Sequence, residues 1–407
     1  MHKALVLALA AASLAVAADP KPKVRAITAF IHMDASHYEA QVAEAAKFLT
    51  AAKAEYEAAG FEVQTLRLVP QPLSEYVRGM KHDDAVALVR KYGELAGKLG
   101  MRPNLGALML DGADDRFATD VAIDVFASSG INGSLIVADE TGIRWKNVRE
   151  AARVIRSVSM KSPNGDGNFN FAAAAMVKPY TPFYPAAYHS GPGKTFAVGL
   201  ESANVVQQVF AGTREAGPAE DRLSAALTKL LQPAEAAGLR VASKTGWTYA
   251  GVDPTPAPMG DVSIGAAIES FTGAAFGAGG TMTAAGIITR AVQSTKVKQV
   301  GYSGLMVPVL EDNLLAKRWA EGTYNIDSLL AYSAVCAGGL DTVPLPGDIT
   351  EEQIARIIGD VASLAWKWHK PLAARLLPAP GRKAGERTSF QDSRMANTVI
   401  QRIPGTR

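Results

Sequence analysis

Apolar and polar positions along the first part of the chain predict strands that are followed by amphipathic helices. A β-rich run at residues 24–31 precedes a helical pattern at 38–59, which Gly60 ends. The same order recurs three times, at 61–68 with 83–98, at 106–110 with 115–127, and at 134–139 with 146–160. Strands and helices of these lengths in alternation predict βαβ units and a largely parallel sheet.

The pattern changes at residues 162–193, which are dense in Gly, Pro, Asn and aromatic residues. This stretch is too apolar for a flexible linker and too interrupted for regular structure. We predict an ordered loop region near a functional site, and a domain linker is the alternative.

Helices and short strands alternate again in the second half of the chain. Thr350 precedes a strong helical pattern with two glutamates in its first turn, which is typical of a capped helix start. The other expected elements are a strand at 196–200, a helix at 202–236 with a break near Gly217, and short strands at 239–243 and 247–253.

The amino-terminal residues have the three-part pattern of a secretory signal peptide. Lys3 precedes an apolar run, and small residues close that run near Ala17 and Ala18. Because the run is shorter than the roughly 20 residues that span a bilayer, we predict cleavage instead of an anchor helix. The protein is therefore expected to be periplasmic or secreted, with no membrane contact after cleavage.

Composition narrows the class of protein. The 407 residues are 48% hydrophobic and 20% charged, with a net charge of +3, which is the balance of a globular protein with a substantial core. No cluster of Lys and Arg interleaves with aromatic residues, so nucleic-acid binding is not predicted. The single cysteine, Cys336, excludes an internal disulfide and a Cys-rich metal site.

Three kinds of residue are candidates for chemistry. Gly279, Gly280 and Thr281 precede an Ala-rich helix, where backbone amides favour an anion, and a tight turn into a packed helix is the alternative. His32, just after the first strand, and His189 are acid–base candidates with structural roles as the alternative. Carboxylates at loop-like positions can do acid–base chemistry or hold a hard cation if they converge, and singly they are caps or turn residues: Asp253, Asp261, Glu269, Glu311, Asp312, Asp341 and Asp348.

Two familiar patterns are incomplete. Gly193-Lys194-Thr195 ends like a phosphate loop, but Tyr188 occupies the upstream glycine position. Residues 244–246 read KTG, as in penicillin-recognising enzymes, but no Ser stands three residues before any Lys. Neither function is predicted.

Several sequence blocks resemble the uncharacterised family filed as domain of unknown function 711. The blocks are NFNFAAAAMVKPYTPFYPAAYH, FAVGLE, GVDPTPAPMGDVSIGAAIE, GGTMTAAGIIT and SAVCAGGLDTVPLPGD, and the likeness runs from about Val24 to Ser389. That family is grouped with pyruvate formate-lyase and ribonucleotide reductase, so the resemblance implies an α/β fold, a formate-lyase-like ten-stranded barrel with a central finger loop. The expected domains are a signal peptide at 1–18, a single barrel domain at 19–389 and an irregular tail at 390–407.

The resemblance does not extend to glycyl-radical catalysis. Cys336 is the one residue that can match the finger-loop cysteine of those enzymes. The glycyl-radical motif R-V-x-G-Y is incomplete here, because the chain offers only the residues QVGY at 299–302, far from the carboxyl terminus.

Together these features predict an exported, non-radical enzyme, a lyase or hydrolase, that acts on a small anionic metabolite. The alternatives are a protein that binds a metabolite or divalent cation without turnover, and a structural protein without a pocket. No cofactor is firmly implied, metal ligands stay unassigned, the expected partner is a small molecule, and a homo-oligomer is left open. The expected catalytic residues are His32, Asp253, Glu269, Glu311, Asp341 and Cys336, and the expected substrate-binding residues are His189, Gly279, Gly280 and Thr281.

Overall fold

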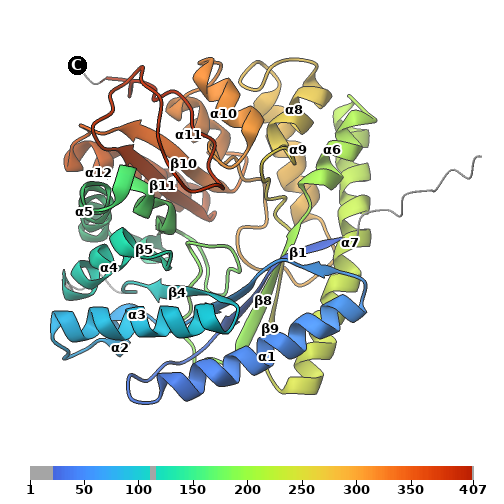
Figure 1. Cartoon of the computed structure of the whole chain (residues 1–407). Coiled ribbons are helices and arrows are strands. Elements are labelled where there is room, and N and C mark those ends of the chain that lie inside the picture. The colour runs from blue at the N-terminus through green and yellow to red at the C-terminus, as the bar shows by residue number, and fades with distance from the viewer. Residues whose placement is uncertain (1–21, 111–115, 406–407) are drawn as a thin grey trace, which may run out of the picture.

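The alternation of strands and helices is present in the structure, a computed structural model that describes residues 22–110 and 116–405 (Figure 1). The strands are β1 (Lys23–Phe30), β2 (Glu62–Val63), β3 (Leu66–Val69), β4 (Met101–Ala107), β5 (Asn132–Asp139), β6 (Gly142–Ile143), β7 (Phe171–Ala175), β8 (Thr195–Glu201), β9 (Thr248–Asp253), β10 (Gly338–Pro346) and β11 (Leu372–Ala379). The helices are α1 (Tyr38–Ala58), α2 (Leu73–Tyr76), α3 (His82–Lys98), α4 (Arg116–Ser128), α5 (Trp145–Lys161), the 3-10 helix η1 (Pro163–Asn170), α6 (Ala203–Ala211), α7 (Ala216–Thr245), α8 (Ile264–Thr272), α9 (Thr281–Gln293), α10 (Asn313–Ala320), α11 (Ile326–Ser333) and α12 (Glu351–Trp368).

In the described part of the chain, the strands form one mixed sheet of eleven. Nine of them follow the order β10-β11-β7-β5-β4-β3-β1-β8-β9, and the short strands β2 and β6 pair with β1 and β5. The five central strands from β7 to β1 are parallel to one another. The outer pairs β10–β11 and β8–β9 are each parallel but join the centre in antiparallel fashion. The α/β class is confirmed, and the sheet is mixed.

Among the described residues, hydrogen bonds do not close this sheet into a barrel. Its edges are β9 and β10, and residues 299–311, which we call the bridging segment, run from one edge to the other. The Val300 amide donates to Val252 O in β9 at 3.1 Å, and the Val309 amide donates to Asp341 O in β10 at 3.0 Å. These contacts place both edges around one interior space. They do not establish the expected formate-lyase-like barrel.

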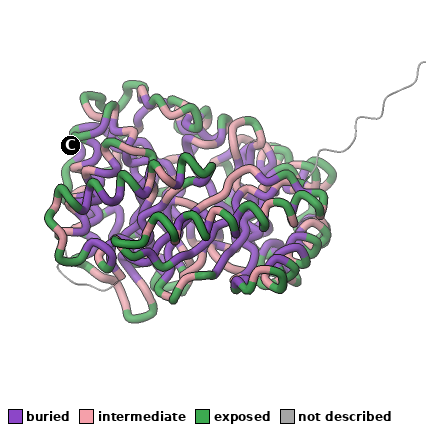
Figure 2. Tube along the Cα trace, turned by 60° about the horizontal axis from the view of Figure 1, so that its bottom comes forward, coloured by how far each residue is buried: buried purple, intermediate pink, exposed green. Residues whose placement is uncertain are grey.

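Helices surround the curled sheet. α12 packs against α5, and the series continues through α4, α3, α1, α7, α9 and α11 back to α12 (Figure 1). Their outer faces are exposed and their inner faces are buried against the sheet (Figure 2). The spacing of apolar residues accounts for this, since α5 buries Val148, Ala151, Ile155 and Val158 on one stripe. None of the helices in the described ranges has the length and apolar character that crossing a bilayer requires.

Several segments differ from the expected elements. The strand expected at 106–110 is β4, at 101–107, and the strand expected at 61–68 is divided into β2 and β3. β7 lies inside the stretch at 162–193, where its sequence FAAAA gave little strand signal, and it forms because all five residues are buried between β5 and β11. Residues 239–243, expected as a strand, continue α7. The buried residues Ala234, Ala237 and Val241 follow helical spacing, so the packing of one helical face decides the conformation.

The described part of the tail, residues 390–405, contains no helix or strand and is packed against the fold. Phe390, Met395 and Ile400 are buried. The Ala396 amide donates to Leu310 O at 2.7 Å, so the tail covers the end of the bridging segment. The expected signal peptide at 1–18 lies outside the described residues.

Candidate functional site

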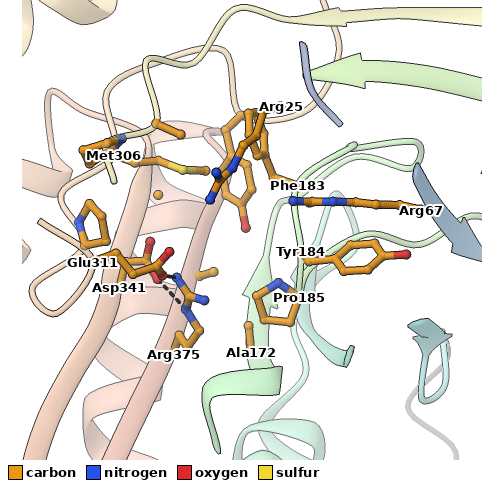
Figure 3. Close-up of a pocket in the computed structure, with 16 residues that line it drawn as sticks. Arg25, Arg67, Ala172, Phe183, Tyr184, Pro185, Met306, Glu311, Asp341 and Arg375 are labelled. Carbon is orange, nitrogen blue, oxygen red and sulfur yellow. Dashed lines mark hydrogen bonds and ion pairs between the residues drawn. The ribbon is translucent and has the colours of Figure 1, made fainter. Parts of the chain in front are cut away.

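A cavity of about 70 Å³ lies within the curl of the sheet (Figure 3). Its polar wall residues come from distant parts of the chain: Arg25 in β1, Arg67 in β3, Tyr302 and Glu311 in the bridging segment, Asp341 in β10 and Arg375 in β11. Apolar residues complete the lining, among them Ala172, Phe183, Pro185, Met306 and Ala373. The curl of the sheet and the bridging segment therefore create the site together.

Arg375 joins two carboxylates on one wall of the cavity. Its Nε donates to Asp341 Oδ1 at 2.7 Å, and its Nη2 donates to Glu311 Oε1. The guanidinium also lies over the Phe169 ring, 4.8 Å from the centroid. Burial raises the pKa of Glu311, the Arg375 charge opposes that rise and the Asp341 charge adds to it. Glu311 is thus a carboxyl group that gains a proton more readily than usual.

A β-bulge in β10 places Asp341 at the cavity. The pairing of β10 with β11 shifts register between Leu340 and Val343, and Thr342 has a φ of 48°. A β-branched residue rarely adopts that left-handed conformation. Here it is held in place because the Leu310 amide donates to Thr342 Oγ1 at 3.0 Å. Bulges and strained residues of this kind concentrate at functional sites.

Asp253 organises the loop that carries Tyr302. Its carboxylate accepts hydrogen bonds from the amides of Tyr302 (2.8 Å), Ser303 (3.2 Å) and Thr255 (3.0 Å), and from Thr255 Oγ1 (2.6 Å). Gly301 has a φ of 77°, and a Cβ there would overlap the Asp253 carboxylate. Burial raises the pKa of Asp253 to about 6. Asp253 does not line the cavity, but it positions a residue that does.

Arg25 and Arg67 form the wall opposite the carboxylates, with their guanidinium ends directed into the cavity (Figure 3). Arg67 donates to Pro182 O at 3.1 Å and to Thr65 Oγ1 at 3.2 Å. No carboxylate of residues 22–110 and 116–405 forms an ion pair with Arg67. Burial lowers the pKa of Arg67 to about 10, and the Arg25 charge contributes to this lowering.

Of the other expected catalytic residues, His32 and Cys336 lie outside the cavity lining. His32 is exposed beyond the end of β1. Cys336 is buried, and burial raises its pKa to about 11. A thiol with a raised pKa is a poor nucleophile, because the thiolate is the reactive form. A catalytic role for either residue stays a prediction.

Glu269 also lies away from the cavity. It pairs with Arg318 Nε at 2.6 Å and accepts from the Phe276 amide at 2.8 Å. The hydrogen bonds from Arg318 lower the pKa of Glu269. These contacts connect α8 with α10 and with the loop after α8, so in this structure Glu269 holds these elements together.

The expected substrate-binding residues do not meet at the cavity either. His189 is fully buried, its Nε2 donates to Ile31 O at 2.8 Å, and burial lowers its pKa. Gly279 and Gly280 are exposed at the start of α9, and Thr281 Oγ1 accepts from the Gly277 amide at 3.0 Å. The turn before α9 is therefore closed on itself. In the described part of the chain, no three His, Cys, Asp or Glu residues are grouped so that they can hold a metal ion.

Sequence reasoning found Glu311 and Asp341 but missed the three arginines and Tyr302. A usable signal was present: Arg25, Arg67 and Arg375 each stand within a strand whose residues are mostly apolar. A charged residue in such a position is costly to bury unless it has a partner or a function. Tyr302 belongs to the residues QVGY at 299–302, which from the sequence alone resemble only an incomplete radical motif.

Comparison with known proteins places the chain among relatives of unknown activity. The family described as Uncharacterised ACR (DUF711) matches residues 17–393. A UPF0210 protein of Pyrobaculum aerophilum is 31% identical over 345 residues, which cover 80% of this chain and 76% of the relative. UPF0210 proteins of Desulforudis audaxviator (28% identical, 81% and 77% covered) and Methanopyrus kandleri (30% identical, 76% and 72% covered) are similar.

These findings correct the functional prediction. The relatives are named only as UPF0210 proteins, and their names state no reaction, ligand or export. The prediction of an exported lyase or hydrolase, with a binding protein as its alternative, is therefore wrong as a statement of function. The comparisons show the family of the chain, and the printed names of its relatives assign no activity.

Proposed function

The chain belongs to the DUF711 family. We propose that this family member is an acid–base enzyme of the isomerase type, which moves a proton from one position to another on a small molecule held in the cavity. The observation that carries the proposal is the pair of carboxylates, Glu311 and Asp341, that share Arg375 at the cavity wall. A carboxyl group whose pKa is raised by burial, in an enclosed site beside a second carboxylate, is typical of acid–base catalysis.

Glu311 is the residue that transfers the proton. Its Oε1 is engaged by Arg375, which leaves Oε2 for the bound molecule. Burial raises the pKa of Glu311, so the carboxylate takes a proton from the molecule and the acid returns it at another position. Arg375 holds the side chain in one orientation during both steps.

Tyr302 supports this step as a hydrogen-bond donor. Burial raises the pKa of Tyr302, so its hydroxyl stays protonated in the cavity. A neutral hydroxyl there can donate to an oxygen of the bound molecule where negative charge develops when a proton leaves. Asp253 fixes the backbone that carries this tyrosine.

Deuterium exchange tests the proposed function. The full chain is incubated in D2O with a panel of small molecules that have acidic C–H bonds, and deuterium incorporation is followed by NMR. We expect Glu311→Gln to slow exchange by at least about a hundredfold, the usual range for the loss of a general acid–base group. Glu269→Gln is the matched control and should exchange as the wild type does. Equal exchange by Glu311→Gln and the wild type would overturn the proposal.

On architecture, we propose that the curled sheet with its bridging segment is an interrupted form of the expected barrel. The hydrogen bonds of the bridging segment support this, because the Val300 amide donates to β9 and the Val309 amide donates to β10. An experimental structure in which β9 and β10 lie far apart would contradict it.

A further inference from the structure

Arg67 is a charged residue with which no carboxylate of the described residues forms an ion pair. Two of its hydrogen bonds go to uncharged oxygens, those of Pro182 and Thr65, and its guanidinium lies over the Tyr184 ring at 4.7 Å. A guanidinium has five N–H donors. The remaining donors of Arg67 face the cavity, where the described residues give them no acceptor (Figure 3).

Arg25 adds a second cation at the same wall. It donates to Gln64 Oε1 at 3.2 Å, and Glu201, its carboxylate neighbour, is 3.8 Å away. The two arginines stand on the adjacent parallel strands β1 and β3, where Thr28 pairs with Arg67. Two cations on one wall of a small, enclosed space repel each other unless an anion lies between them.

The opposite wall cannot supply that anion. Glu311 and Asp341 are both engaged by Arg375, which pairs with them from β11. The charged groups that line the cavity are thus three arginines and two carboxylates. Because Glu201, outside the lining, pairs with Arg25 at 3.8 Å, the arginine left without an ion pair is Arg67. An oxyanion between Arg25 and Arg67 completes the balance.

We infer that Arg25 and Arg67 form a clamp for the carboxylate group of the substrate, which would make the substrate class a small carboxylic acid. A carboxylate matches the fork geometry of arginine and accepts two parallel N–H bonds. Held there, the acid presents its carbon atoms toward Glu311 on the opposite wall. This inference rests on the proposed function, because it assigns the substrate class of the same site.

The size of the cavity limits the acid. At about 70 Å³ it has less than half the volume of the roughly 150 Å³ engineered cavity that takes up benzene. Acids of the size of acetate, glycolate and propionate fit this limit, and large polycarboxylates do not.

Calorimetry on the full chain at low ionic strength tests the clamp. Acetate, glycolate and propionate form one arm, and inorganic phosphate and sulfate form the other. We expect at least one carboxylate to bind, and Arg67→Gln to weaken its binding on the order of tenfold to a hundredfold, the value of one hydrogen bond to a charged group. The affinity of Arg67→Lys for the carboxylate should lie between those of the wild type and Arg67→Gln. Lysine keeps the positive charge but cannot donate two parallel N–H bonds. Arg290→Gln, which removes an exposed arginine paired with Glu220, should bind as the wild type does.

A second measurement needs no variant. An arginine-specific dicarbonyl reagent is applied to the wild type, and mass spectrometry follows modification of Arg25 and Arg67 with and without the acid. Protection of these two residues supports the clamp. Binding of phosphate or sulfate alone, no binding of any acid, or equal affinity of folded Arg67→Gln would overturn it. Glu311→Gln should keep the binding while it loses exchange, so failure of the clamp and failure of the proposed function give different results.

Discussion

At the scale of single residues, the site depends on how a few buried charges are compensated. Arg375 is compensated by two carboxylates, Arg67 by none of the described residues, and Asp253 by four hydrogen-bond donors without a cation. Each arrangement has a different consequence for stability, and each consequence can be measured.

Replacing Arg375 should destabilise the protein strongly. Arg375→Gln leaves Glu311 and Asp341 close together without their shared cation, and breaking a buried ion pair in this way costs about 3–5 kcal/mol. The loss should shrink at low pH, where protonation removes the two negative charges. Urea denaturation measures it, and Arg290→Gln, an exposed pair, should lose at most about 1 kcal/mol. Equal losses for the two variants would contradict the account.

Asp253 should make stability depend on pH. Burial raises its folded pKa from 3.8 to about 6, so the folded state holds a proton that the unfolded state has released between these values. This contribution is fully present below pH 3.8 and is lost as the pH rises through 6, and it amounts to about 3 kcal/mol. Denaturation of the wild type and Asp253→Asn from pH 4 to 7 measures the difference. A constant difference across that range would refute the assignment.

At the scale of elements, the sequence predicts what local patterns determine. The helix that begins after Thr350 is present with its capping box, in which Thr350 and Gln353 bond each other's backbone. The strand conformation of β7 depends on its neighbours in the sheet. The helical conformation of residues 239–243 depends on the packing of the buried face of α7. The cavity depends on contacts between β1, β3, β11 and the bridging segment, whose residues are distant in sequence. The sequence therefore predicts Glu311 and Asp341 as single candidates but does not predict that they lie together with the arginines.

Gly301→Ala should destabilise the loop that carries Tyr302. The new Cβ would overlap the Asp253 carboxylate and would also be forced into a positive φ. Gly322→Ala is the matched control, since Gly322 has a φ of 71° but no atom within 4 Å of an added Cβ. We expect the control to lose about 1 kcal/mol from the positive φ alone, and Gly301→Ala to lose more, within the 1–3 kcal/mol range of overpacking, in thermal or chemical denaturation. A larger loss in Gly322→Ala would count against the role given to Asp253.

At the scale of the whole molecule, the bridging segment should unite the two edges of the sheet into one cooperative unit. The amides of Val300 and Val309 bond β9 and β10, so both should exchange with D2O as slowly as the central amide of Ile31, which donates to Val69 O. Hydrogen exchange with NMR detection measures this. If Val309 exchanges as fast as the turn amide of Thr141, the edges open independently.

The central claim is that Glu311 is a proton-carrying group in an arginine-lined cavity. Its carboxyl carbon can be followed by NMR in protein with 13C-labelled glutamate, with Glu311→Gln identifying the signal. We expect a titration midpoint above the usual 4.5, because burial and the Asp341 charge outweigh the Arg375 charge. A midpoint at or below 4.5 would contradict the claim, because Glu311 would then be a permanent ion-pair partner of Arg375.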